Sequence, residues 1–202
     1  GLGVIRLSII LPTSGRPTLY RAAASAHAQM LPGDELLILR DASGDWGATP
    51  RNAAMLRAGG DYLVFLDDDD ALAPGGLAAV RNAAAECLGR PLVFRVDMGG
   101  HHVWGTAGEV AIGNVTTGGI VVPNDPARLG RWSTRYQCDF DFLESTAALY
   151  PPDSVVWRGE VLTLTRPPGV IVPAALPVVF DPPAFLPPDP LGGTPIYEQW
   201  SG

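Results

Sequence analysis

The sequence predicts a single α/β domain with a central, mainly parallel mixed sheet flanked by helices. Three observations support this fold class. Through residues 4–98, short apolar runs alternate with alanine-rich stretches of helical length, and such alternation requires crossover connections between parallel strands. Apolar residues make up 47% of the 202 residues, enough for one sizeable core. Polar clusters follow the first three runs, and ligands bind beyond the carboxyl ends of the strands in open α/β sheets.

The expected elements of the first half follow from their composition and their end signals. Runs of leucine, isoleucine and valine between Gly, Pro and Asp clusters indicate buried strands. Pro17 marks the start of the first helix, and Thr49 suits an N-cap with Pro50 at the first helical position. Gly89 closes the third helix. In chain order we expect strand 4–11, helix 17–30, strand 35–39, helix 49–59, strand 62–66, helix 73–89 and strand 92–98.

The second half of the sequence is less regular. The stretches HHVWG, EVAIG and GGIVVP predict short strands within residues 101–123, and residues 137–150 predict a short helix. Residues 154–166 predict a pair of strands around Arg158 and Gly159. The chain therefore divides into residues 1–98, residues 99–166 of the same domain, and a Pro-rich tail. We expect this tail, residues 167–202, to be extended and to wrap the domain in part.

The composition excludes several classes of function. The formal net charge of −7 argues against a non-specific grip on nucleic acid, which needs many cationic contacts. All 14 cationic side chains are arginine, so lysine-dependent chemistry such as a P-loop or a Schiff base is excluded. Cys87 and Cys138 are too few for a disulfide scaffold, and free thiols indicate a cytoplasmic setting. We expect no membrane span and no signal peptide.

Four consecutive aspartates, Asp67 to Asp70, directly follow the expected strand 62–66. Like charges at this spacing repel each other unless a cation or hydrogen-bond donors neutralise them. Because the run lies at the edge where sites form, it indicates a site rather than a solvated turn. An EF-hand loop is a poor match, since counting from Asp67 places Ala78 at the twelfth position, where a carboxylate is needed. A dinucleotide site would need G-x-G-x-x-G after the first strand, where the sequence has PTSGRP.

Three stretches in order, LSIILPTSGRP, LLILRDASGD and TPRNAAMLRAGGDYLVFLDDDD, carry a family pattern. They resemble the nucleotide-sugar glycosyltransferases of the GT-A fold, in particular glycosyltransferase family 2. The resemblance covers about residues 6–90 and continues weakly to about residue 166. It implies a GT-A (Rossmann-like) domain in which residues 1–98 bind a nucleotide-diphosphate sugar and residues 99–166 bind the acceptor. The sequence departs from the family at Arg40, where an acid is usual, and this leaves Asp41 alone.

The resemblance assigns Asp67, Asp68 and Asp69 to the Asp-x-Asp motif of the family. It implies Asp69 as the metal ligand, with Asp67 on the ribose or in the metal shell. Hard oxygen ligands suit Mn²⁺ or Mg²⁺, and such an ion would neutralise the departing diphosphate. Alternation along the strand end would point Asp67 and Asp69 the same way. We expect Asp70 to cap the following helix.

The same resemblance implies the contacts to the nucleotide. Pro12, Thr13 and Arg16 are expected to line the nucleotide pocket, and Asp41 to accept a hydrogen bond from the base or the ribose. Asp67 and Asp68 are expected to contact the nucleotide sugar as well. Arg51 is expected to reach the diphosphate with both ends of its guanidinium group. The alternative for Arg51 is a solvated helix residue.

An inverting transfer also needs a carboxylate that takes the proton of the acceptor hydroxyl. In the family resembled, this acid lies in a Glu-Asp motif that opens a helix after the acceptor-side loops. The stretch YQCDFDFLEST (136–146) occupies that place, with Cys138 where Glu is usual and Asp139 where Asp is usual. Asp139 is therefore the expected base and Asp141 the reserve. The alternative for Asp139 is an N-capping acid.

Several assignments stay open at this stage. His101 and His102 face opposite ways on a strand, which favours an acceptor-side role over joint metal binding. A degenerate glycosyltransferase that only binds nucleotide or glycan is a second possible function, and a sugar-nucleotide nucleotidylyltransferase is a third. The acceptor cannot be read from the sequence. The tryptophans that suit either sugar stacking or core packing are Trp46, Trp104, Trp132 and Trp157.

Overall fold

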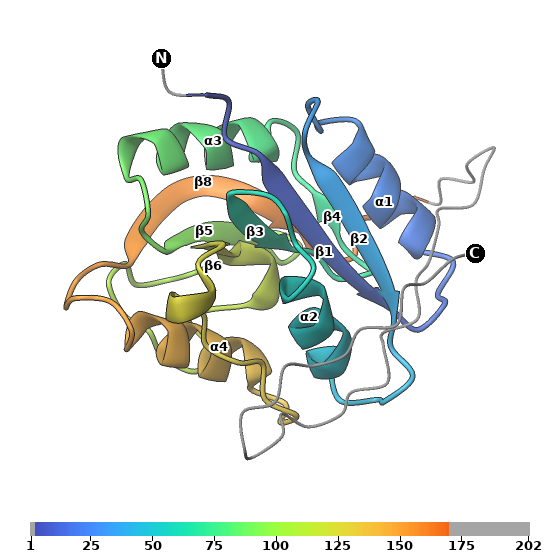
Figure 1. Cartoon of the computed structure of the whole chain (residues 1–202). Helices are drawn as coiled ribbons and strands as arrows, with labels where there is room; N and C mark the ends of the chain where they lie inside the picture. Colours follow the sequence, from blue (N-terminus) through green and yellow to red (C-terminus); the bar gives the residue numbers. More distant parts are fainter. Residues whose placement is uncertain (1–2, 170–202) are drawn as a thin grey trace.

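In the computed structural model, which describes residues 3–169, a curled mixed sheet runs between two pairs of helices (Figure 1). The strands are β1 (Leu7–Thr13), β2 (Glu35–Arg40), β3 (Tyr62–Phe65), β4 (Ala71–Leu72), β5 (Leu92–Asp97), β6 (His102–Val103), β7 (Ile120–Pro123) and β8 (Val156–Leu164). The helices are α1 (Leu19–His27), α2 (Ala48–Met55), α3 (Gly76–Glu86) and α4 (Cys138–Ala147), with short 3₁₀ turns η1 (Thr117–Gly119) and η2 (Pro126–Arg128).

The order of the strands places three loops at one edge of the sheet. The order is β2-β1-β3-β7-β5-β8-β4, and β6 pairs with β5. β1 is parallel to both β2 and β3, and β5 is parallel to β8. β7 is antiparallel to β3 and β5, so β5 and β8 also run in the direction of β1. The mixed α/β fold class is thus confirmed, and the carboxyl ends of β1, β2, β3, β5 and β8 share one edge.

The core has one layer on each face of the sheet. On one face, Leu7, Ile9 and Leu11 of β1 pack with the apolar sides of α1 and α3. On the other face, Ile10 packs with residues of α2 and α4, including Phe142. The alternation of β1 residues between the two layers follows from the two-residue period of a strand, since both faces of this sheet are covered. Figure 1 shows α1 and α3 on one side of the sheet and α2 and α4 on the other.

The elements predicted for residues 4–98 all form, although some ends differ. Thr49 is not the N-cap of α2. The cap is Gly47, which has a left-handed φ of 78°, and the helix begins at Ala48. The reason is that the Asp45 carboxylate accepts the Thr49 amide at 3.1 Å and the Thr49 hydroxyl at 2.6 Å, which closes the turn earlier. Asp70 does not cap α3 either, because that helix begins beyond Gly75.

Two predictions in the second half are wrong. Residues 154–166 form the single strand β8 instead of a pair, because shifts in its register with β5 near Arg95 absorb the Arg158-Gly159 irregularity. The stretch EVAIG forms no strand. It lies in a loop that the Asn114 side chain holds, through donation to the carbonyls of Thr106 and Glu109 at 2.7 Å each.

Other features of the chain are only partly described. Both cysteines are free, as predicted; the cytoplasmic setting inferred from them stays a prediction. In the described part of the chain, no helix has the length and apolar character needed to cross a membrane. Residues 170–202 of the predicted tail lie outside the described residues.

Candidate active site

The three predicted polar clusters meet at the carboxyl edge of the sheet. The Asp41 amide donates to the Thr13 carbonyl at 2.7 Å, which joins the ends of β1 and β2. The Thr13 hydroxyl donates to Asp68 Oδ2 at 2.7 Å, which joins the ends of β1 and β3. Pro12 precedes Thr13 within β1 and is buried beside Leu39 of β2. The predicted convergence of these segments is therefore confirmed.

Residues 67–70, here called the aspartate turn, do not continue β3. The strand ends at Phe65, and the Asp70 amide donates to the Asp67 carbonyl at 3.2 Å, as in a turn. Strand alternation therefore does not apply to these side chains. Asp67 contacts a residue of α2, whereas Asp68 and Asp69 share a contact with Arg16.

Asp68 is buried and held by groups that follow β1. Its carboxylate accepts the Thr13 hydroxyl, the Ser14 amide at 3.2 Å and Arg16 Nη1 at 3.4 Å. Burial raises the pKa of Asp68 above its ordinary value, although these donors act in the opposite direction. Asp68 thus fixes the loop after β1 against the aspartate turn.

Asp69 lies between two arginines from distant parts of the chain. Its Oδ2 accepts from Arg16 Nη1 and from Arg166 Nε, both at 3.0 Å. Arg166 follows β8 and has a left-handed φ of 44°. Arg21 of α1 donates to the carbonyl of Asp69 at 2.6 Å and to the carbonyls of Pro167 and Gly169. Arg21 therefore holds the chain after β8 against the aspartate turn.

Asp70 is the most perturbed acid of the turn. It is buried, and its Oδ1 accepts the Arg166 amide at 3.0 Å. Burial and the nearby charge of Asp67 raise the pKa of Asp70 to about 7. A carboxyl group with this pKa changes its charge near neutral pH.

Arg51 of α2, which lies on the opposite face of the sheet from α1 and α3, binds Asp67. Arg51 is only 3% exposed, so the solvated alternative is wrong. One of its Nη groups donates to Asp67 and the other donates to the Trp46 carbonyl, the latter at 2.6 Å. Its guanidinium also lies over the Trp132 ring, 4.5 Å from the centroid. Arg51 thus fixes the position of Asp67, with both ends of its guanidinium already engaged.

Asp139 stands in the first turn of α4, on the same side of the sheet as Arg51. The N-cap of α4 is Gln137, so the capping alternative for Asp139 is wrong. Its Oδ1 accepts the Phe140 amide at 2.8 Å. Burial raises the pKa of Asp139, and the charges of Arg51 and Asp67 are close enough to act on it. Within residues 3–169 no ion pair to Asp139 is recorded, whereas the reserve acid Asp141 is bound by Arg135 and Ser133.

The aspartate turn fits a divalent cation that takes most of its ligands from a substrate. Residues 3–169 contain no set of three or more His, Cys, Asp or Glu side chains placed to hold a metal by themselves. The side chains of Asp67 and Asp69 are 36% and 19% exposed and reach the surface. Mg²⁺ commonly binds one or two carboxylates together with substrate phosphates. The assignment of Asp67 and Asp69 as ligands stays a prediction, since arginines pair with both carboxylates here.

Sequence reasoning missed Arg21 and Arg166. Both contact Asp69, yet neither lies in a motif of the family resembled. The four consecutive acids were the one available signal, since a buried acidic run requires cationic partners. Both histidines are exposed: His101 lies in the turn after β5 and His102 begins β6, where it pairs with Asp97.

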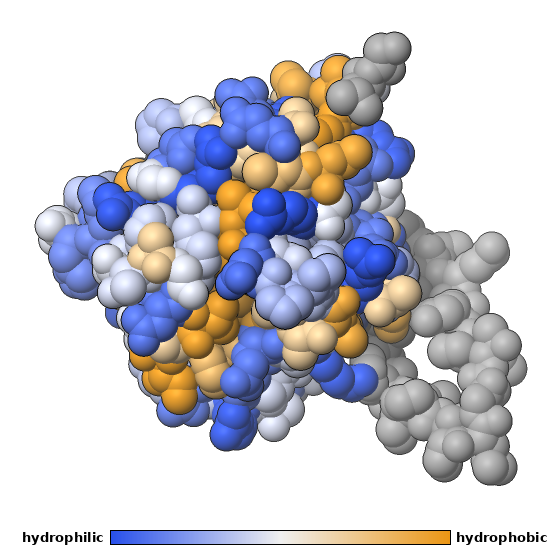
Figure 2. Space-filling view, turned by 90° about the vertical axis from the view of Figure 1, so that its left-hand side faces the viewer, coloured by the Kyte–Doolittle hydropathy of each residue, from blue (hydrophilic) through white to orange (hydrophobic). Residues whose placement is uncertain are grey.

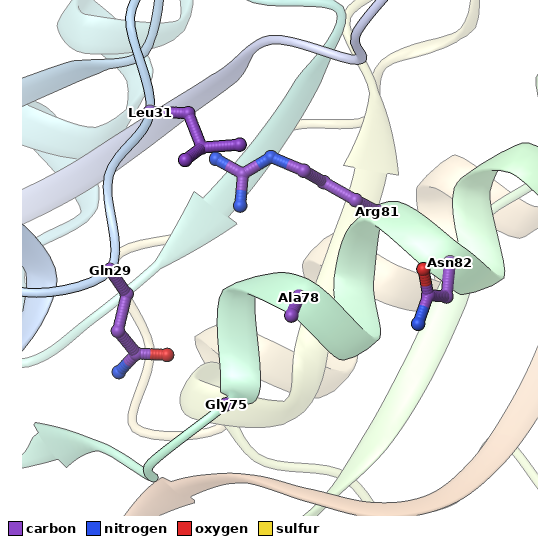
Figure 3. A pocket seen from close by; sticks show the side chains of 6 residues that line it. All are labelled: Gln29, Leu31, Gly75, Ala78, Arg81 and Asn82. Atoms are coloured by element: carbon purple, nitrogen blue, oxygen red, sulfur yellow. The ribbon is translucent and has the colours of Figure 1, made fainter.

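The two best-defined hollows of the described chain hold none of the predicted site residues. One, of about 300 Å³, lies between the end of α1 and α3, where Gln29, Leu31 and Arg81 line it (Figure 3). The other, of about 330 Å³, lies beside Trp157 and Val110. Figure 2 shows the face from which β8 starts, and on it hydrophobic residues lie among hydrophilic ones. The predicted site residues thus line neither of these two hollows.

Comparison with known proteins supports the fold. No protein-family model and no curated protein matches the sequence. Among solved structures, the chain is similar to S. aureus TarS, a glycosyltransferase. The match to TarS 1–349 has a TM-score of 0.61 at 14% identity and covers 80% of this chain and 60% of that chain. The UDP complex of TarS matches with a TM-score of 0.59 at 16% identity over 80% of this chain and 60% of that chain.

The complex of TarS with UDP-GlcNAc gives a similar result. Its TM-score is 0.60 at 16% identity, and the match covers 80% of this chain and 58% of that chain. The chain therefore spans about 60% of the length of TarS 1–349. At these identities the likeness shows a shared glycosyltransferase-like fold.

Proposed function

We propose that the protein transfers a sugar from a nucleotide-diphosphate sugar to a hydroxyl group of an acceptor, with inversion at the sugar carbon and with the help of Mn²⁺ or Mg²⁺. The observation that carries this proposal is the meeting of Thr13, Asp41 and the aspartate turn at one sheet edge, with Asp139 close enough for the charges of Arg51 and Asp67 to act on it. The TarS structures support the donor class, since two of them contain UDP or UDP-GlcNAc.

The residues at the ends of β1 and β2 would bind the nucleoside. Thr13 and Asp41 offer polar groups at adjacent strand ends, and Pro12 provides the buried wall beneath them. Arg16 is half exposed and already faces the aspartate turn, so its guanidinium can pair with a phosphate that arrives there. Arg166, which is also exposed and donates to the same oxygen of Asp69, would do the same.

Asp67 and Asp69 would hold the divalent cation, together with phosphate oxygens of the donor. When bound, this ion supplies Lewis-acid stabilisation of the departing diphosphate. Arg51 keeps Asp67 oriented through its buried ion pair. Asp68 is occupied by Thr13 and Ser14, and its role is to fix the loop after β1.

Asp139 would act as the base. The acceptor oxygen attacks the sugar carbon and forms a new C–O bond, while the bond from that carbon to the phosphate oxygen breaks. The electron pair leaves with the nucleoside diphosphate, and the proton of the acceptor hydroxyl passes to Asp139. Because burial raises its pKa, the Asp139 carboxylate is a stronger base than a solvated one.

A thermal-shift screen of nucleotide sugars, with and without Mn²⁺, tests this function. A ligand at 100 times its Kd stabilises the folded state by about 2.7 kcal/mol, which is readily measured. We expect a Mn²⁺-dependent shift with at least one nucleotide sugar, followed by slow release of the nucleoside diphosphate. Binding without release would favour the degenerate, binding-only function, and a screen without any shift would refute nucleotide-sugar binding.

A further inference from the structure

Two exposed aromatic side chains lie together near the candidate base. Trp46 is 58% exposed and Tyr136 is 73% exposed, and their rings meet edge to face with centroids 5.1 Å apart. Packing explains the other described tryptophans better: Trp104 and Trp132 are buried, and the half-buried Trp157 meets Trp104 edge to face. Neighbouring exposed aromatics commonly mark a binding surface. Trp46 and Tyr136 are here called the aromatic pair.

The backbone of the aromatic pair is held in place by the site itself. Trp46 has a left-handed φ of 62°, which is rare for a bulky residue and is found at functional positions. Its carbonyl accepts from Arg51 Nη1 at 2.6 Å and lies 4.0 Å from the Cys138 sulfur. Tyr136 comes three residues before Asp139 in the chain. The same contacts therefore position Trp46, Asp67 and the first turn of α4.

The location and chemistry of the aromatic pair identify the kind of ligand. A molecule resting on it would lie beside Asp139, where the acceptor hydroxyl must be. A pyranose ring has a C–H face that packs on an aromatic ring and hydroxyl groups at its edge. The nucleobase is expected on the other side of Arg51, near Thr13 and Asp41.

We infer that Trp46 and Tyr136 form the acceptor subsite and that the acceptor is a carbohydrate, bound by stacking of a pyranose ring on the aromatic pair. This inference rests on the proposed function, because it assigns the acceptor of the same reaction.

A glycan array probed with the parent protein and with Trp46→Ala and Tyr136→Ala tests the inference. Both side chains are exposed, so these variants are expected to fold. The parent should bind a set of glycans, and each alanine variant should bind them about tenfold more weakly, as expected for a lost stacking contact. Trp46→Phe and Tyr136→Phe, which keep a ring, should restore most of the binding. Leu88→Ala, at a 64% exposed residue beyond α3, is the matched control and should bind like the parent.

Calorimetric titration of UDP and Mn²⁺ into the same variants separates this inference from the proposed function. We expect the alanine variants to bind UDP as the parent does. The inference is overturned if the parent binds UDP but no glycan, if glycan binding survives both alanine substitutions, or if Trp46→Ala weakens UDP binding, since the pair would then hold the nucleobase. If the parent binds glycans through the pair but binds no nucleotide, the proposed function fails while the carbohydrate subsite stands.

Discussion

The aspartate turn and Asp139 are two acidic regions at the same end of the molecule, but their surroundings differ. In the turn, arginines from three separate elements approach Asp67 and Asp69. Asp139 lies in the first turn of α4, is half-buried, and forms no ion pair within residues 3–169. The turn therefore holds negative charge beside cations, whereas Asp139 lacks such a partner, as the proposed role of a base requires.

Under the proposed function, this difference would let one site bind a diphosphate and activate a hydroxyl group. Arginine is always charged and forms bidentate contacts with phosphate and carboxylate alike. Arg16 and Arg166 can therefore turn from Asp69 to an arriving phosphate. An arginine paired with Asp139 would lower its pKa and weaken it as a base. The separation of the two regions keeps these requirements apart.

The largest expected effect is on the proton acceptor. Asp139→Asn removes the basic oxygen but keeps the size of the side chain, so transfer should fall by about 10²- to 10⁴-fold. Donor binding should be unchanged, because the aspartate turn is intact. Asp141→Asn is the matched control: its carboxylate is bound by Arg135 and Ser133, and its loss should leave transfer close to the parent rate. Transfer assays on both variants would exclude Asp139 if they gave equal rates.

The next largest effect is expected on nucleotide binding when Asp69 of the aspartate turn loses its charge. Asp69→Asn should weaken Mn²⁺-dependent binding of a nucleoside diphosphate by about tenfold or more, since an amide is a poorer ligand for a hard cation. Asp61→Asn, at the opposite end of β3, removes the same charge from a surface pair with Arg6. It should bind like the parent in calorimetry. Equal affinities for all three proteins would mean that Asp69 is not a metal ligand.

Buried and exposed arginines of the turn should differ in their contribution to stability. Arg51→Ala removes a buried guanidinium that pairs with the partly exposed Asp67 and contacts the Trp132 ring, and should lower the free energy of unfolding by about 2–3 kcal/mol. Arg16→Ala removes an exposed arginine and should cost less than about 1 kcal/mol. Urea unfolding measures both, and a reversed order would contradict the structural role of Arg51.

The smallest effect is the pH dependence of stability that comes from Asp70. Its pKa rises from 3.8 to about 7 on folding, so the folded state keeps a proton that the unfolded chain has lost. The contribution of Asp70 to stability therefore falls as the pH rises from about 4 to about 7. The side chain of Asp70→Asn does not titrate, so the variant keeps its stability over this range. Its free energy of unfolding should therefore rise relative to that of the parent by about 2 kcal/mol between pH 5 and pH 8. A constant difference in the free energy of unfolding over this range would place an ordinary carboxyl group at Asp70.

The fold of residues 7–70 and the location of the aspartate turn could be predicted because their signals are local. The strands β1, β2 and β3 are each an apolar run followed by a polar cluster. Because these strands are parallel, the crossover connections bring their ends together. The strand β4 was missed because it has only two residues and pairs with β8, far along the chain.

The partners of the acids could not be predicted because they depend on distant contacts. Arg166 reaches Asp69 only through the pairing of β8 beside β5 and β4. The burial of Arg51 depends on Trp132, which the Asn52 side chain anchors through hydrogen bonds of 2.9 Å and 3.1 Å. No local pattern records such pairings. The exposure of Trp46 could not be predicted either, since tryptophan is also common in protein cores.

Calorimetric titration of nucleoside diphosphates with Mn²⁺ into the parent, Asp69→Asn and Asp139→Asn proteins tests the division of work between the two acidic regions. UDP, GDP, ADP, CDP and dTDP form the panel. We predict that the parent and Asp139→Asn bind the same nucleotide with similar affinity, and that Asp69→Asn binds it at least about tenfold more weakly. Equal weakening by both substitutions, or by neither, would contradict separate roles for the aspartate turn and Asp139.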